Sequence, residues 1–199
     1  MIASTVIWLA PISQGWAELT ELDWRVDGDK AITHDTRTGL DSLDLTESVG
    51  RSFNDVSNNL NRGGDFECFR HATFDEVYGL LTSVGWPVIA SNLFDPAAYQ
   101  PLSKLQSLVG ITIDRGFILE SHGTTANIVS GVRDGVSIYV DPIHFAGLTQ
   151  RGGGWDDDVA EDIVGHWLVR TECVDEEFPW EFFMPAIQSN IKRKSQISQ

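Results

Sequence analysis

The residues best suited to chemistry lie late in the chain, where Trp155 and a run of aspartates directly follow Gly152–Gly154. Carboxylates gathered in a glycine-flanked loop can supply several of the roughly six to eight oxygens that Ca²⁺ takes in proteins. The segment therefore predicts a calcium site, and the alternative is an acidic loop that is only solvated. The predicted metal ligands are Asp156, Asp157, Asp158 and Glu161.

Trp155 is also the best candidate for contacting a ligand through an aromatic ring. It lies in a glycine-rich segment that we expect to be an exposed loop, and an indole ring can stack on the face of a sugar. The sequence thus predicts a glycan contact at Trp155. We expect Trp24, Trp86 and Trp167 to pack in the core instead.

No catalytic residue is predicted, because no set of reactive side chains has the spacing of a catalytic motif. The chain has no His-Glu-x-x-His spacing, no Gly-x-Ser-x-Gly elbow and no phosphate-binding glycine loop. Ser121, His122 and Asp141 cannot be assembled into a triad without tertiary structure. The pattern favours a protein that is not an enzyme. The scattered histidines are His34, His71, His122, His144 and His166.

Two short capped helices are expected in the first half of the chain. Ser52 is an N-cap with an acidic residue in the following turn, and Thr73 and Glu76 form a Thr-x-x-Glu capping box. Gly85 ends the second helix. Between the helices, Phe66–Arg70 alternates apolar and polar residues, which predicts a half-buried strand.

The second half of the chain predicts one further helix and several antiparallel strands. A short helix is expected over Pro101–Val109, Arg133-Asp134-Gly135 predicts a hairpin turn, and Gly165–Arg170 predicts the closing strand. This order of elements indicates an α+β domain. The other expected strands cover residues 110–113, 117–120, 127–132 and 136–140.

The charge of the chain excludes one class of partner. The formal net charge of the 199 residues is -15, so the surface repels phosphate backbones and we expect no nucleic acid to bind. Such an acidic surface favours cation binding or life in a salty medium, or it is simply well solvated.

The termini indicate export. Ile2–Ile12 is an apolar run of signal-peptide length, too short to span a bilayer, with expected cleavage between Ala17 and Glu18. The alternative for this run is a buried first strand. Phe178–Ile187 contains Glu181 and prolines, so it is not a transmembrane anchor. We therefore expect a signal peptide at residues 1–17, one domain at 18–177, and an extension at 178–199 that is basic at its end.

Two cysteines, Cys68 and Cys173, complete the list of reactive side chains. An even number of cysteines in an exported protein indicates one disulfide, and the alternative is two buried thiols.

Seven short blocks follow one another along the chain: Asp35–Leu40, Leu43–Thr46, Ser52–Val56, Gly63–Phe66, Phe69–Thr73, Glu76–Val77 and Gly165–Arg170. In this order they resemble a domain of bacterial exported proteins of the PEP-CTERM type. The resemblance spans about Trp24 to Arg170, and Ser42 stands where that domain has Trp. It implies a periplasmic or extracellular protein, and the absence of the sorting tail after Arg170 implies release.

The same blocks are more distantly similar to the C-terminal domain of bacterial collagen-like adhesins. That similarity implies a C-type-lectin-like α+β fold, with two short helices on twisted antiparallel sheets and long loops. Trp155-Asp156-Asp157 also resembles the Trp-Asn-Asp element of calcium-dependent lectins. The expected function is a non-enzymatic surface or matrix domain that binds glycan or another extracellular partner. The alternatives are a hydrolase or oxidase on this fold, and a structural subunit that assembles with itself.

Overall fold

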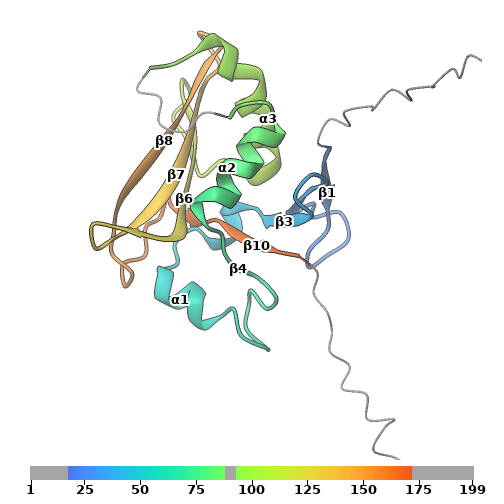
Figure 1. Ribbon diagram of the computed structural model, residues 1–199, viewed down its shortest axis with the longest axis vertical. Helices are drawn as coiled ribbons and strands as arrows, with labels where there is room; N and C mark the ends of the chain where they lie inside the picture. The colour runs from blue at the N-terminus through green and yellow to red at the C-terminus, as the bar shows by residue number, and fades with distance from the viewer. Residues whose placement is uncertain (1–17, 88–92, 172–199) are drawn as a thin grey trace, which may run out of the picture.

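The computed structural model describes residues 18–87 and 93–171, and these form two antiparallel sheets with short helices (Figure 1). The predicted signal peptide, Cys173 and Phe178–Ile187 lie outside the described residues. The first sheet has the order β1-β2-β3-β10-β4. Its strands are β1 (Leu19–Leu22), β2 (Ile32–Asp35), β3 (Leu40–Leu43), β10 (Leu168–Arg170) and β4 (Arg70–His71).

The second sheet is built from three long strands with two short ones added. Its order is β5-β6-β7-β8, and β9 runs parallel to β6. None of the helices within the described ranges is long and apolar enough to cross a membrane. The strands are β5 (Ile113–Asp114), β6 (Leu119–Val129), β7 (Val132–Asp141), β8 (Ala146–Trp155) and β9 (Gly165–His166).

The helices begin where the sequence predicts. The Ser52 hydroxyl accepts a hydrogen bond from the Asp55 amide at 3.1 Å, and Thr73 and Glu76 form the reciprocal capping box. The helix expected over Pro101–Val109 is also confirmed. The elements are α1 (Phe53–Asn58), α2 (Phe74–Ser83), α3 (Tyr99–Val109) and two 3-10 turns, η1 (Leu45–Ser48) and η2 (Pro96–Ala98).

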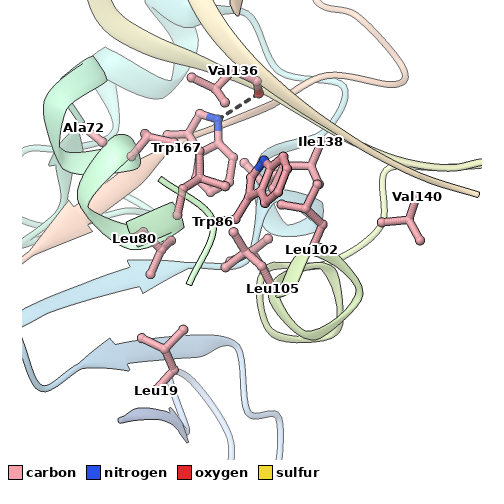
Figure 2. Close-up of a cluster of buried hydrophobic side chains, with 14 of the residues drawn as sticks. Leu19, Ala72, Leu80, Trp86, Leu102, Leu105, Val136, Ile138, Val140 and Trp167 are labelled. Carbon is pink, nitrogen blue, oxygen red and sulfur yellow. Dashed lines mark hydrogen bonds between the residues drawn. The ribbon is translucent and has the colours of Figure 1, made fainter. Parts of the chain in front are cut away.

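The main core lies between the β6–β8 sheet and the helices α2 and α3 (Figures 1 and 2). Leu102 and Leu105 of α3 face Ile138 of β7, and all three side chains are fully buried. Each such side chain contributes about 1.5–3 kcal/mol relative to exposure. Trp167 is buried as predicted, and its indole N–H donates to the Val136 carbonyl at 3.1 Å (Figure 2).

The other tryptophans expected in the core differ from each other. Trp86 is buried as predicted, whereas Trp24 is only partly buried. Trp24 stacks on Phe66 at 6.0 Å between ring centroids, in a smaller second cluster.

The prediction of a hairpin turn at Arg133–Gly135 is wrong. The turn between β6 and β7 is Ser130-Gly131, and both residues have positive φ, 54° and 84°, as a tight two-residue hairpin requires. Arg133–Gly135 lies inside β7. Glycine at position 135 lets the Trp155 ring lie close to the backbone of β7, because a Cβ on Gly135 would be 2.4 Å from that ring.

The prediction of an exposed loop at Gly152–Gly154 is also wrong, because these glycines continue β8. The pairing of β7 with β8 shifts register between Arg133 and Asp134. A Cβ on Gly153 would lie 2.9 Å from the Arg133 carbonyl oxygen, so glycine permits the close approach. Trp155 is consequently the last residue of a strand rather than a loop residue.

Two predicted strands are shorter or divided. Of Phe66–Arg70, only Arg70 joins a strand, because Cys68 has a φ of 72° that extended backbone does not allow. The closing segment Gly165–Arg170 splits at Trp167 into β9 in the second sheet and β10 in the first. Trp167 thus connects the two sheets through its backbone, donating to the Thr124 carbonyl and accepting from the Ala72 amide.

Candidate functional site

A hollow of about 380 Å³ lies beside the β6–β7 hairpin and the end of β8. Arg133 and Trp155 are cross-strand partners at its base, and Gly131 of the tight turn lies at its edge. The side chains that line it are Ile128, Val132, Arg133, Trp155, Asp156 and Asp157. The hollow therefore combines one large aromatic ring, two branched apolar side chains, two carboxylates and one cation.

Trp155 is half-buried, because its ring lies over Gly135 of the neighbouring strand while the side chain also lines the hollow. Trp155, which was predicted to contact a ligand, therefore lines the hollow. It does so from the end of a strand and not from an exposed loop. A smaller void of about 10 Å³ also touches Trp155, with Phe53 and His166 among its lining residues. It has room for roughly one water molecule.

Arg133 is the most constrained charge at this site, with only 8% of its surface exposed. Its guanidinium donates two hydrogen bonds to the Asp157 carboxylate, from Nε at 2.9 Å and from Nη2 at 2.7 Å, and a third to the Ala126 carbonyl. The bond to Arg133 is the main cause that lowers the pKa of Asp157. Paired in this way, the buried cation avoids most of the cost of desolvation.

Phe53 of α1 lies between Arg133 and His71. The guanidinium carbon of Arg133 is 3.5 Å from the centroid of the phenyl ring, and the His71 ring stacks on it at 3.8 Å and 17°. Two groups this close to one centroid must occupy opposite faces of the ring. Both contacts hold α1 against the two sheets, through β7 of the second sheet and the edge strand β4 of the first.

Two buried histidines form the floor below Phe53, and both are neutral. His71 Nε2 is 3.0 Å from the Ser57 hydroxyl, which itself donates to the Phe53 carbonyl, so Nε2 carries the proton. His71 Nδ1 has no partner among the described residues. Burial, followed by the nearby His166, lowers the pKa of His71 to about 3.

His166 has the same tautomer for a related reason. Its Nε2 is 2.9 Å from the Arg51 carbonyl oxygen, which can only accept, so Nδ1 accepts from the Thr124 hydroxyl at 2.6 Å. Burial is the main cause that lowers the pKa of His166 as well. His71 Nδ1 has no acceptor for a second proton among the described residues, and burial lowers the pKa of both rings, so both histidines are uncharged at neutral pH.

The predicted calcium ligands are close in sequence but point to different partners. Asp157 pairs with Arg133, and Asp158 accepts from the Asn54 side-chain amide at 2.6 Å. Asp156 accepts from the backbone amide of Asp158. The described part of the chain contains no group of three or more His, Cys, Asp or Glu side chains that could hold a metal ion. The calcium site that includes Glu161 stays a prediction.

Cys68 lies just before β4, and its predicted partner Cys173 is outside the described residues. The disulfide therefore stays a prediction.

Sequence reasoning missed Arg133, Phe53 and His71 as parts of this site. Arg133 was expected in a turn, and the predicted site included no residue of the helix that follows Ser52. No local signal identifies them, because Arg133 is 24 positions from Asp157, and α1 and β7 are still farther apart in the sequence.

Comparison with other proteins adds no relative: no family model, curated protein or solved structure matches this chain. The class of the protein is therefore defined by its architecture, a mixed α+β arrangement of two antiparallel five-stranded sheets with short helices. A tryptophan-lined hollow at the β6–β7 hairpin distinguishes it.

Proposed function

We propose that this chain is a binding domain that takes a glycan in the hollow beside Trp155. The observation that carries the proposal is the lining of that hollow, where an indole ring lies next to the exposed carboxylate of Asp156. Its volume of about 380 Å³ is within the range of small-ligand sites. A sugar offers both an apolar ring face for the indole and hydroxyl groups for a carboxylate.

The apolar side of the hollow supports the same ligand class. Ile128 is 61% exposed and Val132 is 43% exposed, so both can contact the apolar face of a sugar ring opposite Trp155. Arg133 is already paired with Asp157, which leaves little positive charge for an anionic ligand. A neutral or amino sugar therefore suits the site better than an acidic one.

We further propose that the domain has a C-type-lectin-like fold and acts in the periplasm or outside the cell. The mixed arrangement of short helices on antiparallel sheets supports the fold, and the apolar run Ile2–Ile12 supports export. Export is tested by the mass of the protein recovered from periplasm and medium. A chain that begins at Glu18 supports it, and a retained, uncleaved chain contradicts it.

The glycan proposal is tested on a glycan array with the wild-type chain, Trp155→Ala and Phe117→Ala. Phe117 is an exposed aromatic residue that does not line the hollow, so it controls for general stickiness. We expect wild type and Phe117→Ala to retain the same glycans, and Trp155→Ala to bind them about tenfold more weakly or worse. The proposal is contradicted if no glycan is bound, or if Trp155→Ala binds the same glycans as strongly as wild type. Concentration-dependent self-association without glycan binding would instead favour a structural subunit.

A further inference from the structure

A second group of reactive side chains lies on the outer face of the β6–β7 pair. Glu120 and His122 alternate along β6, and Ser137 and Tyr139 alternate along β7. The register places His122 opposite Ser137 and Glu120 opposite Tyr139, so all four project from one face. The intervening residues turn inward, as the fully buried Ile138 does.

These side chains form a directed chain of hydrogen bonds. His122 Nε2 is 2.7 Å from Glu120 Oε2, and His122 Nδ1 is 3.2 Å from the Ser137 hydroxyl. An ionised carboxylate can only accept, so Nε2 carries the proton and Nδ1 has a free lone pair. When the imidazole is neutral, the Ser137 hydroxyl therefore donates its proton to Nδ1.

Glu120 is held in the form that this arrangement needs. Burial opposes its ionisation, but the hydrogen bonds from Arg115 and His122 hold the pKa of Glu120 below its ordinary value. Arg115 Nε donates to the carboxylate oxygen that His122 does not use. The carboxylate thus fixes the tautomer and orientation of the imidazole.

We propose that Ser137 is a nucleophile, with His122 as its general base and Glu120 as a positioning residue, and that the substrate is a small carboxylic ester. A serine, a base in hydrogen-bond reach and a third group that orients the base are the parts that acyl transfer needs. The roles of the two imidazole nitrogens are exchanged relative to the usual triad. This inference goes beyond the proposed glycan binding and does not depend on it.

The reaction balances without a cofactor. Ser137 Oγ bonds to the ester carbonyl carbon while its proton passes to His122 Nδ1, and the imidazolium then protonates the leaving alkoxide as its C–O bond breaks. Water next attacks the acyl-serine and gives a proton to Nδ1, which returns it to Ser137 Oγ as the acid leaves. The net change is ester plus water to acid plus alcohol.

Access and polarity limit the substrate class. Ser137 is only 6% exposed, so the proposed substrate carries a small acyl group such as acetyl. Tyr139 packs edge-on against His122, and burial raises the pKa of its hydroxyl. This O–H therefore stays protonated at neutral pH. It donates a long hydrogen bond of 3.4 Å to Gln150 Oε1, and it would have to leave that acceptor to stabilise the developing oxyanion.

Sequence reasoning considered Ser121, His122 and Asp141, and the structure places only His122 in this group. Ser121 turns to the inner face and donates to the Gly110 carbonyl at 2.7 Å. Asp141 pairs with His144 instead, at 2.7 Å.

The test uses the full chain with methanesulfonyl fluoride, a serine-reactive probe about as small as an acetyl group, and with 4-nitrophenyl acetate. We expect one methanesulfonyl adduct on Ser137 by peptide mass spectrometry, and loss of both labelling and ester hydrolysis in Ser137→Ala. His122→Gln is expected to lower both rates about 100-fold or more. His144→Gln is the matched control, because it has a similar histidine–carboxylate pair without a serine, and its rates should equal those of wild type.

The positioning role of Glu120 has its own readout. Glu120→Gln should slow labelling because it removes the carboxylate that orients the imidazole, and Glu120→Asp, which keeps the charge, should restore part of the rate. Thermal unfolding confirms that each variant is folded. An unlabelled Ser137 in the wild-type protein, or labelling that His122→Gln leaves unchanged, overturns the proposal whatever the stability of the variants.

Discussion

The guanidinium carbon of Arg133 lies 3.5 Å from the centre of the Phe53 ring, and this contact joins the second sheet to the helix α1. Asp157 holds the guanidinium in place with two hydrogen bonds, so the carboxylate, the cation and the ring act as one unit. Because Arg133 and Asp157 also line the hollow, the packing of α1 and the shape of the candidate site are linked.

Asp157→Asn removes the charge that pairs with Arg133. We expect the free energy of unfolding to fall by about 1–2 kcal/mol, because hydrogen bonds to a buried cation are strong but Asp157 is partly exposed. Urea denaturation measures the change. Asp156→Asn is the control, since Asp156 is exposed and bonds only to a loop amide, and it should change stability by less than about 0.5 kcal/mol. Equal losses in both variants would contradict a special role for the Arg133 pair.

His71 predicts that stability falls on acidification. Its pKa is about 3 in the folded protein and near 6.5 when unfolded, so between these values the unfolded chain binds a proton that the folded chain does not. The free energy of unfolding should therefore decrease as the pH drops below about 6.5, with a limiting slope of about 1.4 kcal/mol per pH unit.

His71→Gln removes this titration, so the difference in stability between wild type and variant should shrink as the pH falls from 7 to 5. His144→Gln is the matched control, because His144 has 78% of its side chain exposed. Urea unfolding of all three proteins at each pH gives the comparison. If the difference in the free energy of unfolding between wild type and His71→Gln does not vary with pH, His71 is not a neutral, buried imidazole.

Asp44 predicts the opposite trend. Burial, followed by repulsion from Glu47, raises its pKa to about 7, and its Oδ1 has no hydrogen-bond partner among the described residues. Between pH 4 and 7 the folded chain therefore binds a proton that the unfolded chain lacks, and the associated stability is lost as the pH rises through 7.

We expect Asp44→Asn to stabilise the protein by about 2 kcal/mol at pH 8 and to have little effect at pH 4. Thermal unfolding at both values measures this. Asp41→Asn provides the contrast, because Asp41 pairs with His34 and Arg170 and its loss should destabilise the protein at pH 8. Destabilisation by Asp44→Asn at pH 8 would count against a half-buried carboxylate whose Oδ1 has no hydrogen-bond partner among the described residues.

Gly135→Ala should distort the candidate site. Its Cβ would lie 2.4 Å from the Trp155 ring and 2.6 Å from the Gly123 carbonyl oxygen, so the indole must move at a cost of about 1–3 kcal/mol. Gly152→Ala is the control, because nothing lies within 4 Å of its added Cβ. Tryptophan fluorescence and thermal unfolding should change for Gly135→Ala alone. Similar spectra and melting temperatures for both variants would show that the indole does not rest on Gly135.

Sequence patterns predicted the elements whose signals are local. The cap at Ser52, the capping box at Thr73 and the helix over Pro101–Val109 were all correct, because each depends on groups within a few residues of one another. The α+β class follows from the same signals.

Patterns failed where a distant strand decides the conformation. Arg133-Asp134-Gly135 has the composition of a turn, yet Ser130-Gly131 makes the turn because the pairing of β6 with β7 places it there. Gly152–Gly154 was expected in a loop, yet it forms part of β8 because glycine allows close approach to β7.

The sequence by itself determined the helix caps, the mixed class of the fold and the presence of Trp155 and its aspartates in one segment, because short-range hydrogen bonds and composition encode them. Only the tertiary structure decided which polar side chains contact one another. Arg133 reaches Asp157 across 24 residues, and His122 reaches Ser137 across 15. Strand register sets these encounters, and register depends on how whole faces pack against the core rather than on any local pattern.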